Sequence, residues 1–451
     1  MESQPRILDK SRQKKFFSFF PELNRKYFLL LFLLAYLLRL GYGLSSEFWF
    51  VDEKQVYLLG LKFYATGEWP FLGPDVVYTN SQVPGALQAL LVGIPFFLLH
   101  IPEAPYLLLN LLSLASLGLL AWYCSLRTPE VPRWFIWSWL LTAPWTLNYS
   151  THIINPSYVL APAILFFIGI LESIPSLSKN IMAPKWAAFL AGFSFLCLFQ
   201  LHLSWPILVP FLVLALFFQW RSQGQKILVS LCYFITGSLL SGSLVLPTFI
   251  KYGLGGLRGV GSNIQVHLRH LLEFFTVLAR FLSFASFELP RFVGANTAAR
   301  LEFFKHNLWV TPMALFVGII GLLQPLAMIV IWFTRKPSQK DWKPVKYFTF
   351  FTLAIVYLSF AFSIKGPSSH TFYVVLPVAM IYSFYCWSLL FSKKAWPVLA
   401  VLFILSGIIF QAGLALSRAS EHSLYKNRKL VVEALEKKDY RILGERPPGH
   451  Y

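Results

Sequence analysis

Charge and cysteine are both scarce in this sequence. Only 13% of the 451 residues are charged, and acidic residues are the rarer kind, with 20 Asp and Glu against 39 Lys and Arg. The cysteines form no CxxC pair, so neither a disulfide framework nor a cysteine-based zinc site is indicated. All four lie in or beside apolar stretches, at Cys124, Cys197, Cys232 and Cys386.

Hydrophobic residues make up 56% of the chain and aromatic residues 18%. They occur in long blocks separated by short basic connections, which is typical of a protein embedded in a lipid bilayer. Much of the formal net charge of +19 comes from those connections, where Lys and Arg set the orientation of membrane segments. We therefore expect the lipid bilayer as a partner, and no nucleic acid.

Apolar runs long enough, or nearly long enough, to cross a bilayer recur along the chain. Helices are the expected form, because a helix satisfies its own backbone hydrogen bonds in lipid. We predict an all-α polytopic bundle of about 11 transmembrane helices, within a range of about 10 to 13. The runs lie at about 27–44, 105–123, 134–147, 157–172, 186–201, 203–220, 227–246, 308–334, 347–363, 371–392 and 395–416.

The apolar run at 84–99 determines the orientation of everything after it. It has 16 residues and contains Pro84, Gly85, Gly93 and Pro95, which favours a juxtamembrane or re-entrant helix over a span. The positive-inside rule supports a non-spanning helix, because about half of the Lys and Arg then lie in cytoplasmic segments. Those segments are the N-terminus and the connections at 124–133, 173–185, 221–226, 335–346 and 393–394.

We expect three parts along the chain. Residues 1–26 form a basic cytoplasmic N-terminus ahead of a retained first span, since no small-residue cleavage site follows that span. Residues 27–416 form the transmembrane domain, with extracytoplasmic segments at 45–104 and 247–307. Residues 417–451 form a short basic tail, which we also expect outside and which is too small for an independent enzyme domain.

The first external segment carries two lysines and six acidic residues, among them the adjacent pair Asp52 and Glu53. Helical spacing places Tyr57 near the face of Glu53. A carboxylate beside an apolar aromatic surface can accept a proton from an attacking hydroxyl or amine, which is the work of a general base. Solvated acids in a loop are the plainer alternative.

Arg39 lies in the outer half of the first apolar run. A cation at membrane depth needs a partner or a function. In one interpretation it pairs with an external carboxylate or holds an anionic ligand. In the other it extends to the lipid headgroups.

Polar residues also gather in the turn at 148–158, which the predicted topology puts on the same face as Asp52. We predict His152 and Asn155 as ligands or orienting residues, and His202 as a further one at the next external junction. The alternatives are an ordinary helix-starting turn and a structural histidine. No HExxH or comparable spacing supports a metal site.

Two more segments combine cations with external positions. Lys251 and Arg258 lie in a glycine-rich stretch whose amides and cations suit a phosphate, although it matches neither a Walker loop nor a dinucleotide fingerprint. Lys365 and His370 precede a late span at its external mouth. The alternatives are a flexible hinge for the glycines and anchoring to lipid phosphate for Lys365.

The basic N-terminus, the first span with Arg39 and the stretch FVDEKQVYLLGLKFYATGEWP resemble the dolichyl-phosphate-mannose protein mannosyltransferases and the lipid A aminoarabinose transferases. Both are polytopic glycosyltransferases of the GT-C class. The similarity continues through YTNSQVPGALQALL, the second external turn and SSHTFYVVLP. It implies a GT-C bundle with extracytoplasmic juxtamembrane helices, in which Asp52 matches the catalytic acid with Glu53 beside it. Where the family often has a further acid, in the second turn, this chain has His152 and Asn155.

The resemblance implies a glycosyltransferase of the plasma membrane with its active site outside. Nucleotide sugars are not supplied there, so we expect a polyprenyl-phosphate sugar as donor and a glycan, lipid or protein as acceptor. Asp52 then deprotonates the acceptor for an inverting attack, and a fixed cation stabilises the leaving phosphate. A divalent metal ion is compatible with this chemistry but not required by it. The cations considered are Arg39, Lys251, Arg258 and Lys365.

A transporter or flippase for a lipid-linked or anionic substrate is the principal alternative, since such proteins also hold charges within a helical bundle. It predicts internal repeats and broken helices at the midplane. No repeat is evident and the polar residues cluster at one face, so the enzyme is favoured. A non-catalytic scaffold is a third interpretation, because the second external turn lacks an acid.

Overall fold

The computed structural model describes residues 25–46, 51–76, 81–253, 266–282, 293–294, 296–334, 340–363, 366–367, 369–391, 395–419 and 423–444. Within these residues the chain is mostly helical, and nine helices are long and apolar enough to cross a membrane. A tenth crossing is present if the bent pair Ile227–Gly242 and Leu246–Tyr252, with 67° between its halves, counts as one span. The predicted polytopic helical bundle is confirmed, with a count at or just below the lower end of the expected range.

The spanning helices follow the predicted apolar runs. They are α2 (Arg25–Ser46), α5 (Ala104–Arg127), α8 (Asn155–Ser173), α9 (Pro184–Leu201), η1 with α10 (Trp205–Leu208, Val209–Gln223), α17 (Thr311–Thr334), α18 with η5 (Trp342–Ser359, Phe360–Phe362), α19 (Leu376–Leu390) and α20 (Trp396–Arg418). The bent pair is α11 (Ile227–Gly242) and α12 (Leu246–Tyr252).

The other elements are shorter. They are α3 (Val51–Thr66), β1 (Leu72–Val76), β2 (Ser81–Pro84), α4 (Leu87–Leu98), α6 (Arg133–Thr142), α7 (Pro144–Thr151), η2 (Gly224–Lys226), η4 (Leu268–Glu273), α14 (Phe274–Leu282), α16 (Thr297–His306), η6 (Ser369–Val375), α21 (Ser423–Glu436) and η7 (Tyr440–Leu443). The core lies around α8 and α19, whose spans are 83% and 89% buried, against 22% for α2.

The run at 84–99 forms the short helix α4, whose 12 residues are too few to cross a bilayer. Gly85 leads into it with φ +103°, a left-handed conformation that favours glycine. α4 packs closely on α3, because a Cβ on Gly93 would lie 2.6 Å from the carbonyl oxygen of Gly60. The predicted non-spanning helix is confirmed in length, and the membrane side on which it lies stays a prediction.

A two-stranded antiparallel hairpin lies between α3 and α4 in the sequence, which the all-helical prediction did not include. Leu72 pairs with Pro84 and Asp75 with Gln82, and the register is irregular between these two pairs. An irregularity of this kind bends a strand and changes the direction of its side chains.

The predicted span at 134–147 is not one helix. It divides into α6 and α7 at Ala143 and Pro144. Proline lacks a backbone N–H and restricts the residue before it, so a helix tends to end there. α6 starts shortly after the end of α5, and α7 is followed by His152, which contacts Ser46 at the end of α2. The pair therefore still runs from one end of the bundle to the other.

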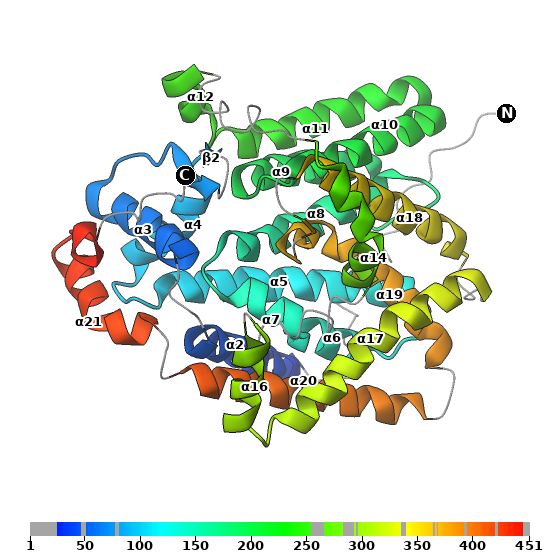
Figure 1. The fold of residues 1–451 in the computed structure, drawn as a ribbon. Helices are drawn as coiled ribbons and strands as arrows, with labels where there is room; N and C mark the ends of the chain where they lie inside the picture. Colours follow the sequence, from blue (N-terminus) through cyan, green and yellow to red (C-terminus); the bar gives the residue numbers. More distant parts are fainter. Residues whose placement is uncertain are drawn as a thin grey trace.

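Polar contacts gather at two opposite ends of the bundle. We call the end with α3, α4 and the hairpin the α3 end. From there α5 runs through 24 residues to the opposite end, the Asp341 end. Three connections predicted to be cytoplasmic meet at the Asp341 end, where Arg127 and Lys179 each form an ion pair with Asp341. The C-terminal tail returns to the α3 end, where Arg428 pairs with Glu103. Figure 1 shows α3, α4 and α21 together on the left.

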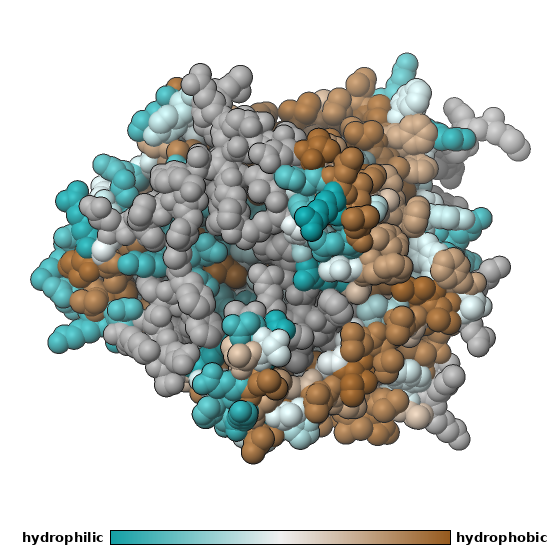
Figure 2. Space-filling view, viewed as in Figure 1, coloured by the Kyte–Doolittle hydropathy of each residue, from teal (hydrophilic) through white to brown (hydrophobic). Residues whose placement is uncertain are grey.

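The flank of the bundle is apolar. Large hydrophobic side chains are exposed along α2, α17 and α20, for example Leu30, Leu322 and Val398. Hydrophobic residues cover the side formed by α17 in the space-filling view, while hydrophilic residues gather over the end with α3 and α21 (Figure 2). This distribution is typical of a multi-pass membrane protein with lipid along its flank and water at its ends.

The orientation is testable with two single cysteines in a background where the exposed Cys232 is replaced by serine. We expect His100→Cys, exposed at the α3 end, to react with a membrane-impermeant maleimide in intact cells. Ser176→Cys, exposed at the Asp341 end, should react only after permeabilisation. The reverse labelling pattern would contradict the assigned orientation.

Candidate active site

The acid pair stands on a fixed helix. Asp52 and Glu53 occupy the first turn of α3, where the helix dipole favours carboxylates, with Asp52 exposed and Glu53 half-buried. The buried ring of Tyr57 packs edge-on against Phe96, with ring centroids 5.5 Å apart. Its hydroxyl donates to the carbonyl oxygen of Pro102 at 2.9 Å. These contacts fix α3 against α4 and against the connection between α4 and α5. The helix that carries the acid pair is therefore held in place.

Tyr57 itself has an anchoring role in these contacts. Burial raises the pKa of Tyr57 well above its ordinary value, the nearby Glu103 raises it further, and Arg428 lowers it. The hydroxyl is therefore neutral, and its proton is used to join α3 to the connection between α4 and α5. A direct contact of Tyr57 with substrate stays a prediction.

A further carboxylate, Asp75, lies beside α3. Its Oδ2 accepts a hydrogen bond from Nε2 of Gln55 at 2.6 Å, and its Oδ1 accepts one from Nε2 of Gln82 at 2.9 Å. Gln55 lies one helical turn after Asp52, so both acids belong to the same end of α3. Sequence analysis missed Asp75, because the segment GPDV has no clear strand pattern and the hairpin is what brings Asp75 to the helix.

The polar turn at 148–158 contacts the end of α2. Nε2 of the buried His152 lies 2.8 Å from the Ser46 hydroxyl, and its ring stacks on Tyr42 with centroids 5.8 Å apart. The Tyr42 hydroxyl also donates to Oδ1 of Asn148 at 2.8 Å. Asp52 follows Ser46 by only about six residues, so their Cα atoms are at most roughly 21 Å apart. His152 therefore lies at the same end of the bundle as the acid pair.

Asn155 is the first residue of α8 and lies half-buried at this end. Its Oδ1 is buried and accepts no hydrogen bond from the described residues. A buried oxygen in this situation is normally satisfied by water or a ligand, because leaving it without a donor costs free energy. Asn155 thus offers an acceptor at the α3 end, and its role as a substrate ligand stays a prediction.

Arg39 stabilises the break between α6 and α7. The guanidinium is fully buried and donates to the carbonyl oxygens of Leu141 at 2.7 Å and Thr146 at 3.2 Å, and also to the Ser150 hydroxyl. The Leu141 carbonyl lies in the last turn of α6, where carbonyl oxygens have no partner within the helix. Neither expected partner, an external carboxylate or a lipid headgroup, accounts for these contacts. Phosphate binding by Arg39 stays a prediction, and these hydrogen bonds do not support it.

Three aromatic rings join η6 to α7. The ring centroid of Tyr373 lies 5.2 Å from that of Trp145 and 5.0 Å from that of Tyr149, and the Tyr373 hydroxyl donates to the Trp145 carbonyl at 2.6 Å. η6 contains His370, whose side chain is outside the described part of the structure. The structure therefore places the backbone of His370 near α7, and its role as a ligand stays a prediction.

The predicted cations are not gathered at the acid pair. Nζ of Lys251, at the end of α12, lies 4.0 Å from the ring centroid of Phe71, a cation–π contact. The Thr248 hydroxyl donates to the Phe71 carbonyl, so both side chains dock α12 next to the hairpin. Arg258 and Lys365 lie outside the described residues.

His202 follows the last residue of α9, and its Nδ1 accepts a hydrogen bond from the backbone N–H of Ser204 at 3.1 Å. Burial lowers the pKa of His202 to about 4. The ring is therefore neutral near pH 7 and does not supply a fixed positive charge for a phosphate. A neutral hydrogen-bonding role toward substrate stays a prediction.

Metal binding has no preformed protein site in the described ranges. No group of three or more His, Cys, Asp or Glu side chains there could hold a metal ion.

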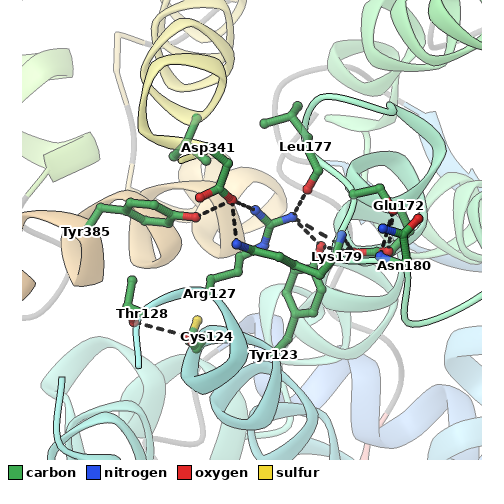
Figure 3. Close-up of polar contacts among 12 residues, drawn as sticks. Tyr123, Cys124, Arg127, Thr128, Glu172, Leu177, Lys179, Asn180, Asp341 and Tyr385 are labelled. Carbon is green, nitrogen blue, oxygen red and sulfur yellow. Dashed lines mark hydrogen bonds and ion pairs between the residues drawn. The ribbon is translucent and has the colours of Figure 1, made fainter. Parts of the chain in front are cut away.

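A dense polar network lies at the Asp341 end, and sequence analysis missed it (Figure 3). Nη1 of the buried Arg127 donates to Oδ2 of Asp341 at 3.0 Å, and Nη2 donates to the Tyr123 hydroxyl at 2.6 Å. The Tyr385 hydroxyl, at 2.6 Å, and Nζ of Lys179, at 3.0 Å, reach the same oxygen of Asp341.

Glu172 forms the other half of this network. Its carboxylate accepts hydrogen bonds from the hydroxyls of Tyr123 at 2.7 Å and Ser178 at 2.8 Å, and from the backbone N–H groups of Lys179 at 3.0 Å and Ile181 at 3.2 Å. The network thus joins α5, α8, the α8–α9 connection, the start of α18 and α19. Removing one member of such a buried network is costly, because it leaves a buried charge without compensation.

The arrangement of the helices defines the fold class: the chain has a GT-C fold, and the predicted fold class is confirmed. It is similar to the solved structure of ArnT, a lipid A aminoarabinose transferase, from Cupriavidus metallidurans bound to undecaprenyl phosphate. The match has a TM-score of 0.50 and 12% sequence identity, and it covers 90% of this chain and 79% of ArnT. At this identity the likeness establishes the fold alone. No protein-family model and no curated protein sequence matches this chain.

Proposed function

We propose that this chain is a membrane glycosyltransferase that moves a sugar from a polyprenyl-phosphate donor to an extracytoplasmic glycan, lipid or protein. The observation that carries the proposal is an acid pair on a fixed helix, at one end of a bundle with the GT-C fold. The ArnT structure is bound to undecaprenyl phosphate, which supports a lipid phosphate as the carrier here.

Asp52 is the proposed base. As an exposed carboxylate it can accept the proton of an acceptor hydroxyl or amine while the oxygen or nitrogen of that group attacks the anomeric carbon. The new glycosidic bond forms as the bond from the anomeric carbon to the phosphate oxygen breaks, and its electron pair leaves with the polyprenyl phosphate. A single displacement inverts the anomeric configuration. Glu53 supports the bound substrate or a metal ion.

The leaving phosphate gains negative charge in the transition state and is best stabilised by a fixed cation. Arg39 contacts carbonyls of α6 and α7, and Lys251 contacts Phe71. We therefore favour Arg258 and Lys365 for this role. Both lie outside the described residues.

Asp75 is proposed to orient the end of α3 by holding the hairpin against it. We expect Asp75→Ala to lower the turnover number by about tenfold, because small displacements of a catalytic group are costly. Asp75→Asn should retain most activity, since a glutamine amide can turn to pair with the new side chain. Transfer assays should show no change in Glu68→Gln, an exposed acid on the same segment. Full activity in Asp75→Ala would refute the assigned role.

A transporter or flippase is the rival function. The buried network at the Asp341 end ties α5, α8, α18 and α19 together, so opening the bundle there would separate buried ion pairs. That closure favours a site used from one side. In proteoliposomes holding a donor labelled in its sugar, a transferase places the label on an added acceptor and leaves polyprenyl phosphate. Intact labelled donor in the opposite leaflet, with no cleavage, would establish transport instead.

A further inference from the structure

The C-terminal segment α21–η7 is folded into the body of the protein. It forms part of the main hydrophobic core at the α3 end, rather than a detached surface helix. Figure 1 shows this segment, in red, on the same side of the molecule as α3, in blue, and η7 contacts α3. The buried side chains of this segment are Leu424, Val431, Ala434, Leu435 and Leu443.

The residues that follow α21, with η7 among them, contact α3. Nζ of Lys438 lies 5.9 Å from the ring centroid of Tyr64, near the end of α3. Near the start of α3, Nζ of Lys54 lies close to Gly444: a Cβ on Gly444, which has φ +89°, would be 3.4 Å from it. Lys54 directly follows Glu53. The tail therefore touches both ends of the helix that carries the acid pair.

An ion pair fastens α21 at the start of α5. Nε of Arg428 lies 2.8 Å from Oε1 of Glu103, and Nη2 lies 3.4 Å from Oε2. Glu103 is the residue directly before α5 and follows Pro102, whose carbonyl accepts the hydrogen bond of Tyr57 on α3. The side chain of Arg428 is 46% exposed, and pairs this exposed contribute little to stability. The pair can thus be removed without unfolding the bundle.

We propose that α21–η7 positions the acid pair, with Arg428 and Glu103 as positioning residues. α3 is held by α4, through the close contact of Gly60 with Gly93, and also by the tail. A base acts only from a narrowly defined position, and a misplacement of about 1 Å can cost about a hundredfold in rate. The inference rests on the proposed function, because it assigns the tail a role in sugar transfer by Asp52.

The test is a set of charge variants assayed with a defined polyprenyl-phosphate sugar. We expect Arg428→Ala and Glu103→Gln each to lower kcat roughly tenfold, with KM for the donor and the yield of folded protein unchanged. The double variant should be no worse than either single one, because both remove the same contact. Arg428→Lys should restore part of kcat, and Lys429→Ala, an exposed neighbour, should have no effect.

Hydrogen exchange of the α3 amides separates failure of this inference from failure of the proposed function. In Arg428→Ala we expect faster exchange in 51–66, whether or not the protein transfers sugar. Faster exchange in Arg428→Ala, combined with a wild-type protein that transfers no sugar, would support the restraint on α3 and reject the glycosyltransferase. Unchanged kcat in Arg428→Ala, or unchanged exchange, would overturn the positioning role.

Discussion

Asp52→Asn should reduce sugar transfer by roughly 100- to 10,000-fold, which is the contribution of a positioned general base. Asparagine has nearly the same shape but cannot accept the proton of the acceptor. It also suits the start of a helix, and the loss of one favourable charge–dipole contact costs at most about 1 kcal/mol. We therefore expect normal membrane insertion and normal binding of the lipid donor.

The comparison variant is Glu53→Gln, which we expect to have a smaller effect on kcat and a larger one on KM, because Glu53 is assigned to binding. Transfer from a sugar-labelled donor to an acceptor measures the first quantity, and binding of polyprenyl phosphate to the purified protein checks the fold. An Asp52→Asn protein with wild-type transfer would show that the base lies elsewhere.

Arg127→Met should lower the free energy of unfolding by about 3–5 kcal/mol, because removing one partner leaves buried charge without compensation. Arg127 and the carboxylate of Glu172 are fully buried, and Asp341 is 12% exposed. Without Arg127, Asp341 keeps its ion pair with Nζ of Lys179, while Glu172 keeps hydrogen bonds from hydroxyl and backbone N–H groups. Asp341→Asn should act in the same direction, since Arg127 then loses its nearest carboxylate.

Denaturation in detergent micelles measures this effect, with Lys340→Ala as the matched control. Lys340 is exposed and directly precedes Asp341, so its removal should leave the unfolding midpoint unchanged. Transfer per folded molecule should remain near the wild-type value in Arg127→Met, because the network is at the end opposite the acid pair. Equal midpoints for Arg127→Met and Lys340→Ala would show that the network contributes nothing to stability.

Local sequence signals predicted much of the fold. Pro84 and Gly85, with a run of only 16 apolar residues, predicted that α4 does not span, and its 12 residues agree. Because α4 was predicted not to span, the turn with His152 was predicted to lie at the same end as Asp52. The contact of His152 with Ser46 places the turn at that end. The length of an apolar run and the presence of turn residues are local properties, so they can be recognised in the sequence without knowledge of tertiary contacts.

One span was predicted over the apolar stretch 134–147, although Pro144 lies within it. Arg39, more than 100 residues earlier, stabilises the break between α6 and α7 by donating to the Leu141 carbonyl before it and to the Thr146 carbonyl after it. The sequence alone does not show that a side chain of α2 supplies these hydrogen bonds, because the partners are far apart in the chain.

The features that sequence reasoning missed depend on pairs far apart in the chain. Arg127 and Asp341 are separated by 214 residues, and Arg428 and Glu103 by 325. Each side chain alone resembles an ordinary basic or acidic residue near a membrane interface. No local period or motif specifies such partners, because tertiary packing alone brings them together.

The stereochemistry and stoichiometry of one turnover test the central claim most directly. With purified protein, a polyprenyl-phosphate sugar of known anomeric configuration and an acceptor, NMR can follow the anomeric proton and the phosphorus together. We predict one polyprenyl phosphate released for each glycosidic bond formed, with the anomeric configuration inverted. A retained configuration, or a product formed without release of polyprenyl phosphate, would contradict direct displacement at Asp52.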